Sequence, residues 1–184
     1  MKVAGALGSG GAIVTNDSAV AERIKRLRYH GRDDSRNYQE LGYNSQIATI
    51  QAAIVGFKLE HLEEWTERRQ HIARRYTSVL DEISWATPPL ETPGAHHVFH
   101  KYVMTAGENR DRLREHLSSA GIGTMIHYAS PLHKEPVFAD YISANDAFPE
   151  SERLSREALS LPIYPELDNN DVDYLCEKLT SFDW

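Results

Sequence analysis

The fold is decided at the start of this 184-residue chain, by Lys2-Val3-Ala4-Gly5-Ala6-Leu7-Gly8-Ser9-Gly10-Gly11-Ala12-Ile13-Val14-Thr15-Asn16-Asp17. The last five residues before Asn16 are rich in β-branched side chains, which predicts a short strand at 11–15. Asn16 and Asp17 favour a turn, and Asp17 or Ser18 can cap a helix that runs to about Arg28. The glycine-rich run matches neither a P-loop nor a dinucleotide-binding fingerprint. The chain therefore begins with an α/β pattern.

The strongest periodic signal lies between Ile47 and Leu80. Apolar residues recur there at spacings of three, four or their sums: Ile50, Ile54, Phe57, Leu62, Trp65, Ile72, Tyr76 and Val79. This period predicts a helix of about 50 Å if it does not kink, at ~1.5 Å per residue. Such a helix is longer than one small domain. We therefore expect it to bridge two bodies or to lie along a partner, with its apolar residues in a core.

Pro88-Pro89 and Pro93-Gly94 mark the main internal boundary, and shorter elements follow it. Strands are expected at 97–104 and 122–128. Between them, Asn109 should cap a helix that Gly121 closes. Two further helices are expected, and the residues predicted to face inward on them are Leu154, Ala158 and Leu159 after Pro149, and Val172, Leu175, Cys176 and Leu179 after a cap at Asp168 or a neighbouring asparagine. This second part has an α+β order.

Composition excludes several classes of function. The formal net charge of −7 argues against nucleic-acid binding, which needs a basic surface. No stretch approaches the ~20 apolar residues that cross a membrane. Cys176 is the single cysteine, so no intrachain disulfide can form and a reducing, cytoplasmic location is expected. His96 and His100 would share one face of a strand while His97 points away, so no metal site is expected there.

Three segments share their spacing with one enzyme family. They are Lys2 followed by Gly5-Ala6-Leu7-Gly8, then Leu41-Gly42-Tyr43-Asn44-Ser45 with Gln51-Ala52-Ala53-Ile54, and finally Gly121-Ile122-Gly123-Thr124-Met125-Ile126-His127-Tyr128. Together they resemble the DegT/StrS-type sugar aminotransferases, which use pyridoxal 5'-phosphate (PLP). The resemblance implies the C-terminal part of an aspartate aminotransferase-like transferase of fold type I. It divides the chain into the tail of the large PLP domain (1–45), a bridging helix (46–85) and a small α+β domain (86–184).

The resemblance also implies roles for four residues. Lys2 falls on the lysine that holds PLP as a Schiff base, and Asn44 would reach the PLP phosphate of a neighbouring subunit in a homodimer or larger homo-oligomer. His127 and Tyr128 would contact a nucleotide-sugar substrate. Each role has a simpler structural alternative. Lys2 can be a solvated terminal lysine, and Asn44 or Ser45 can cap the long helix. His127 and Tyr128 can be exposed polar side chains at the end of a strand.

The family reaction moves an amino group, commonly from glutamate, to a keto-sugar on a nucleotide. Ser9, Gln46 and Ala48 depart from the family pattern, and the segments that the family places before the lysine are absent from this chain. We therefore expect the isolated chain to bind PLP weakly or not at all and to be inactive alone. The alternative is a non-catalytic member of the family, either a self-associating remnant or a ligand-binding module. The clusters Arg26, Arg28 and Arg32, and Arg68, Arg69, Arg74 and Arg75, are expected to be solvated helix faces.

Overall fold

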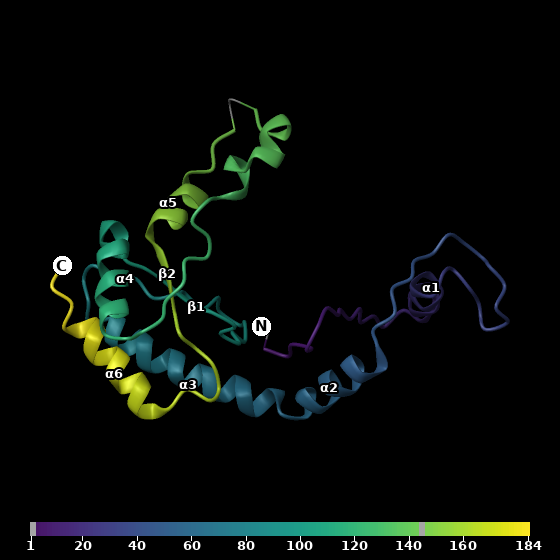
Figure 1. The fold of residues 1–184 in the computed structure, drawn as a ribbon, viewed down its shortest axis with the longest axis horizontal. Helices are drawn as coiled ribbons and strands as arrows, with labels where there is room; N and C mark the ends of the chain where they lie inside the picture. The colour runs from purple at the N-terminus through teal and green to yellow at the C-terminus, as the bar shows by residue number, and fades with distance from the viewer. Residues whose placement is uncertain (1–2, 144–145) are drawn as a thin grey trace. The chain divides into compact units, whose positions relative to one another are not determined.

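The computed structural model describes residues 3–143 and 146–184. The chain divides into two compact units, of which the first ends at Leu62 and the second begins at Glu63 (Figure 1). This boundary lies inside the segment that we expect to bridge two bodies. The division into 1–45, 46–85 and 86–184 remains a prediction. None of the helices in the two described ranges combines the length and the apolar character that a membrane span needs.

The first unit contains two helices, α1 (Ser18–Arg28) and α2 (Thr49–Glu60). The cap of α1 is confirmed, because Asp17 Oδ1 accepts hydrogen bonds from the N–H groups of Ala19 and Val20 at 2.8 and 3.2 Å. The strand expected at 11–15 is wrong. A strand needs a hydrogen-bonded neighbour, and this segment pairs with no other within the described residues, leaving Val14 93% exposed.

Backbone hydrogen bonds order the loop between α1 and α2. Its two ends pair through an isolated bridge between Tyr29 and Asn44, with His30 N donating to Tyr43 O at 2.9 Å. Gly31 has φ +75°, and a Cβ atom there would lie 1.8 Å from the carbonyl oxygen of Glu40. The close approach of these two backbone segments therefore requires glycine at this position.

The helical period from Ile47 to Leu80 produces two helices rather than one. His61 separates α2 from α3 (Leu62–Leu80). Only the second helix supplies a core: Ile72 and Tyr76 are fully buried, whereas Phe57 is 62% exposed. The expectation that Phe57 is a core residue is therefore wrong, because no residue of α2 is buried and the Phe57 ring stays mostly exposed.

The second unit contains a two-stranded sheet with helices around it (Figure 1). After α3 its elements are β1 (Tyr102–Thr105), η1 (Gly107–Asn109), α4 (Arg110–Ser119), η2 (Leu132–Lys134), η3 (Pro136–Tyr141), α5 (Pro149–Glu157), β2 (Ala158–Leu161) and α6 (Asn169–Thr180). The strands are antiparallel, with Tyr102 opposite Leu161 and Met104 opposite Leu159. These four side chains are buried and share one face of the sheet.

The strands differ from the expected ones. The first begins at Tyr102 rather than at 97, and the segment expected as a strand at 122–128 makes only an isolated bridge between Met125 and Ser160. The partner of β1 is β2, which occupies the end of a predicted helix. The helix stops at Glu157 because the following residues complete the sheet, where all four residues of β2 are buried.

In the second unit the predictions for Gly121 and Pro149 at helix ends are confirmed, and the predicted cap at Asn109 is confirmed only in its position. Gly121 has φ +77°, and the N–H groups of Gly121 and Ile122 return to the carbonyls of Ser118 and Leu117, which is a Schellman ending. Asn109 occupies the N-cap position of α4, but its side chain makes no capping hydrogen bond and instead accepts one from Arg112. Pro149 lies in the first turn of α5, as predicted.

The last helix confirms its prediction in full. Asp168 caps α6 by accepting a hydrogen bond from the N–H of Asn170, and the buried residues of the helix are the predicted Val172, Leu175, Cys176 and Leu179. On α5 the inward face is only partly confirmed. Ala158 and Leu159 are buried in β2, whereas Leu154 remains 43% exposed.

Arg69 is not part of a solvated helix face, as the sequence suggested. It is buried on α3, where its guanidinium donates to the carbonyl oxygens of Phe99 at 3.1 Å and Ile163 at 2.8 Å. Burial lowers the pKa of Arg69. The side chain therefore joins the segment before β1 to the segment after β2 across the helix.

Candidate functional site

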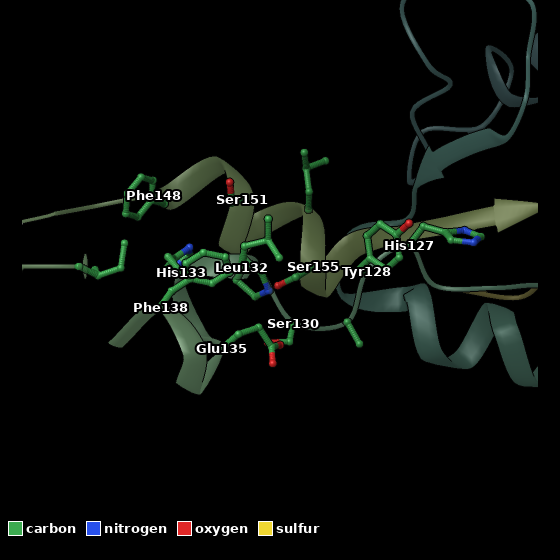
Figure 2. A pocket seen from close by; sticks show the side chains of 14 residues that line it. His127, Tyr128, Ser130, Leu132, His133, Glu135, Phe138, Phe148, Ser151 and Ser155 are labelled. Atoms are coloured by element: carbon green, nitrogen blue, oxygen red, sulfur yellow. The ribbon is translucent and has the colours of Figure 1, made fainter. Parts of the chain in front are cut away.

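A groove of about 1020 Å³ opens on the second unit between η2–η3 and α5 (Figure 2). One wall comes from 131–142 and the other from 148–155. Leu132, Phe138 and Phe148 give it an apolar lining, and Ser130, Ser151 and Ser155 place hydroxyl groups along it. A mainly apolar groove with a few polar groups is the usual form of a small-molecule site.

Both predicted substrate residues of this unit lie at one end of the groove. Tyr128 is 69% exposed. His127 is half-buried, and Figure 2 shows its imidazole turned toward the strand. Its Nδ1 lies 2.8 Å from the hydroxyl of Ser160 on β2. The ring of His127 is therefore held against the sheet, and Tyr128 is the more accessible of the two side chains.

Lys101 and Ser160 belong to the same cluster, and sequence reasoning missed both. The ammonium of Lys101 lies 5.2 Å from the centre of the Tyr128 ring. Burial, and then the charge of Lys101, lower the pKa of His127. The neutral imidazole is thereby favoured. No signal in the sequence pairs Ser160 with His127, because the sheet register that joins them depends on the unpredicted strand β2.

His133 and Glu152 connect the two walls of the groove. His133 Nε2 lies 3.2 Å from Glu152 Oε1, and the His133 ring stacks on Phe148 with 4.6 Å between ring centres. Lys134 reaches the other carboxylate oxygen of Glu152 at 2.9 Å. Hydrogen bonds from Lys134 and then from His133 lower the pKa of the Glu152 carboxyl.

Asn44 lies in the first unit, beside the last turn of α1. Its neighbours hold the backbone there: Tyr43 N donates to Leu27 O at 2.7 Å and Ser45 N donates to Arg28 O at 3.0 Å. Neither Asn44 nor Ser45 caps α2, because that helix starts at Thr49 and Ala48 occupies its N-cap position without a side-chain bond. The capping interpretation is therefore wrong. The N-terminus of α2, whose free N–H groups could bind a phosphate, lies beyond Asn44 in the chain.

The amide of Asn44 is exposed and forms no side-chain hydrogen bond within the described ranges. The positive charge near it comes instead from Lys25, Arg26 and Arg28 in the last turn of α1. Arg26 also contacts Glu40, at 3.3 Å. This position leaves the Asn44 side chain available to a ligand or to a second chain.

The sequence also led to predictions for Lys2 and for the three histidines near position 100. Lys2 lies outside the described residues, so its position stays a prediction. The three histidines near 100 lie before β1 rather than on it. His96 contacts the amide of Gln70, and His97 Nδ1 accepts a hydrogen bond from Phe99 N. In the described ranges, no three His, Cys, Asp or Glu residues group as a metal site would require.

A model of the DegT/DnrJ/EryC1/StrS aminotransferase family matches residues 1–180. The chain belongs to this family. Pyridoxal phosphate is the cofactor of the family, and solved neighbours include forms with PLP and with PMP. The resemblance read from Lys2, Asn44 and His127 with their flanking segments is thereby confirmed as a family assignment.

Several DegT-family proteins are closely similar to the chain. The "Pleiotropic regulatory protein" of Geobacillus stearothermophilus is 42% identical over 180 residues, which is 97% of this chain and 48% of that protein. The "dTDP-3-amino-3,4,6-trideoxy-alpha-D-glucose transaminase" of Streptomyces venezuelae is 37% identical over a match that spans 89% of this chain and 43% of that protein. The chain thus spans about half the length of the curated relatives it matches.

A solved structure shows the same fold. The crystal structure of S. venezuelae DesV in complex with a ketimine intermediate matches this chain with a TM-score of 0.89 and 34% identity. The match covers 95% of this chain and 47% of the DesV chain. This likeness confirms the predicted fold class, which is part of a PLP-dependent transferase of fold type I. The two units therefore have the folds that a partial member of the family is expected to have.

Proposed function

We propose that the chain supplies part of a PLP-dependent aminotransferase that transfers an amino group, from a donor such as glutamate, to a nucleotide-linked keto-sugar in the cytoplasm. The observation that carries this proposal is the family match over residues 1–180, together with a groove bordered by Tyr128. The Streptomyces relative is named as a transaminase of a dTDP-linked sugar, which suggests the substrate class.

The described residues fit a share of a PLP site. Asn44 has a free amide donor on an exposed loop and is not engaged in capping, so it suits a phosphate contact contributed to a second subunit. Lys2 would hold the cofactor, by its place in the family segment. When bound, PLP supplies an electron sink for bond breaking at the amino carbon of the substrate. Lys2 would be the base that takes the proton from that carbon once the substrate amine has displaced it from the cofactor.

The end of the groove at His127 and Tyr128 would position the sugar. Tyr128 offers an exposed hydroxyl, and His127 is favoured in its neutral form, in which one ring nitrogen donates and the other accepts. If Ser160 donates its hydroxyl proton to Nδ1, the proton of the imidazole lies on Nε2, where it can be donated to a sugar oxygen. The apolar walls would exclude water from the bound sugar nucleotide.

Amino transfer by a completed protein tests this function. The chain is joined to the part of the S. venezuelae transaminase that it does not match, and the hybrid protein is assayed with glutamate and a nucleotide-linked keto-sugar. We expect turnover that Lys2→Ala removes, because that lysine is both the anchor and the proton carrier. A soluble, PLP-loaded hybrid without amino transfer would contradict the proposal.

We further propose a homodimer or larger homo-oligomer in which residues 1–80 make most of the contact. In the described part of the first unit Gly31 is the one buried residue, and Ile50, Phe57 and Leu59 of α2 are 69%, 62% and 52% exposed. Apolar surface of this kind marks a protein interface. Sedimentation at micromolar concentration should show a dimer or larger species, and Phe57→Glu should shift it toward monomer. A monomeric wild-type chain would count against the proposal.

The alternative proposal is a non-catalytic member that self-associates or binds a ligand. Two observations favour it: the departures at Ser9, Gln46 and Ala48, and the regulatory name of the Geobacillus relative. Arginine at position 46 would offer a bidentate carboxylate partner that glutamine lacks. A hybrid that dimerises and binds a sugar nucleotide without amino transfer would favour this alternative, and Gln46→Arg would then show whether donor binding is the missing step.

A further inference from the structure

We propose that Glu152 is the positioning residue of the groove: its carboxylate holds the wall formed by 131–142 against α5 and so keeps the groove in its ligand-binding form. The ligand part of this inference rests on the proposed function, in which the groove receives the sugar nucleotide. The positioning itself rests on contacts within the second unit alone.

The first observation is that two links between the walls end on one carboxylate. Both oxygens of Glu152 are used, Oε1 by His133 at 3.2 Å and Oε2 by Lys134 at 2.9 Å. His133 contributes a charge to its contact only when it is protonated. Arg156, one turn along the same helix, lies 3.9 Å from Oε2. Three basic groups from two elements therefore converge on Glu152.

The second observation is that the contact is partly shielded from solvent. The side chain of His133 is 13% exposed and that of Glu152 is 34% exposed. The ring of His133 also stacks on Phe148 with 4.6 Å between ring centres, and Figure 2 shows both rings at the same end of the groove. Partial burial reduces screening by water and salt, so this pair fixes geometry better than a fully exposed pair.

The third observation is that, among the described residues, the wall has few other fixed contacts besides the stack of His133 on Phe148. It consists of two short 3₁₀ helices whose described backbone bonds are local, such as Glu135 N to Leu132 O at 3.0 Å and Phe138 N to Glu135 O at 2.9 Å. Leu132 and Val137 are 71% and 72% exposed, whereas Phe138 is 37% exposed and Pro131 and Ile142 are half-buried. A segment with few buried contacts opens easily unless a specific link retains it. Glu152 provides such a link.

The test is hydrogen exchange on the intact 184-residue chain. Glu152→Ala should speed exchange of the Glu135 and Phe138 amides about tenfold, because local opening becomes easier. Glu152→Gln retains an acceptor oxygen without the charge and should fall between Glu152→Ala and wild type. The matched control is Glu150→Gln on the same helix, whose partner is Arg153 at 2.9 Å and not the wall. Exchange at Leu113 and Leu117 in the core should be the same in all variants and shows that each is folded.

A pH series separates positioning from a general structural role. Hydrogen bonds from Lys134 and His133 lower the pKa of Glu152, so the link is complete at neutral pH and is lost as pH falls through that lowered value. After correction for intrinsic exchange, wild type should show a loss of protection at acidic pH that Glu152→Gln lacks. An identical pH response in both proteins, or unchanged exchange in Glu152→Ala, would overturn the inference.

A binding measurement separates this inference from the proposed function. Uridine diphosphate is used as a probe for sugar nucleotides, with calorimetry on the intact chain. If the probe binds, Glu152→Gln should weaken it about tenfold while Glu150→Gln does not. Equal affinity in the wild-type and Glu152→Gln proteins would contradict the ligand part of the inference. If the wall loosens in Glu152→Ala but wild type binds no probe, the positioning role stands and the proposed use of the groove fails.

Discussion

Replacing Tyr76 by alanine should lower the free energy of unfolding of the second unit by about 3–5 kcal/mol, because a large, fully buried side chain leaves a cavity. Its ring packs edge-on against Tyr102 with 5.2 Å between ring centres, and its hydroxyl donates to Pro162 O at 3.0 Å. Urea unfolding followed by circular dichroism measures the change.

Two variants show which part of that loss belongs to the core. Tyr76→Phe keeps the ring and removes one hydrogen bond, so it should cost only about 1 kcal/mol. Phe57→Ala, at a 62% exposed site on α2, should leave the unfolding of the second unit nearly unchanged. Equal losses for Tyr76→Ala and Phe57→Ala would show that the core described here is wrong.

The second large effect concerns activity rather than stability. In the completed hybrid, the double variant Asn44→Ala/His127→Ala should lower the rate of amino transfer by about 100-fold or more, since misplacement of reacting groups alone can cost that much. Each change should cost at most ~2 kcal/mol of stability, because Asn44 makes no described side-chain bond and His127 makes one to Ser160.

The control for the double variant is His71→Ala, which removes an exposed histidine on α3 away from the groove residues. It should leave both stability and turnover unchanged. Unaltered turnover in the double variant would reduce Asn44 and His127 to structural roles, while the family assignment would remain.

The sequence predicted most accurately those features that depend on local chemistry. The cap at Asp17, the glycine ending at Gly121 and the buried face of α6 all follow from side chains within one or two turns of each other. The family segments also led to the groove, because Tyr128 lies at its end. These features need no knowledge of distant contacts.

The sequence predictions were wrong where residues far away in the chain determine the secondary structure or the burial of a side chain. Ala158–Leu161 reads as the end of an amphipathic helix, yet it forms β2 because β1 is available to pair with it. Apolar periodicity marks Phe57 and Tyr76 alike, but only Tyr76 has neighbours that bury it. Arg69 reads as a surface charge, whereas two carbonyl groups, 30 and 94 residues away in sequence, hold it inside.

Contacts between residues far apart in the sequence also determine which side chains make up the candidate site. Neither Glu152 nor Ser160 was predicted as a site residue. Their roles follow from the side chains that the fold brings beside them, His133 and Lys134 for Glu152 and His127 for Ser160. Asn44, by contrast, was predicted from the sequence. Its motif identified it as a candidate phosphate contact, but the helix that follows the motif begins only at Thr49.

The proposed function depends most on PLP and Lys2, and one measurement tests it directly. PLP is titrated into the isolated chain and into the completed hybrid, the bound cofactor is fixed to its lysine by borohydride reduction, and the labelled peptide is identified by mass spectrometry. We predict weak or no labelling of the isolated chain, and one PLP per hybrid subunit, attached to Lys2 and lost in Lys2→Ala. A hybrid that is folded and dimeric but carries its label on another lysine, or none, would contradict the account.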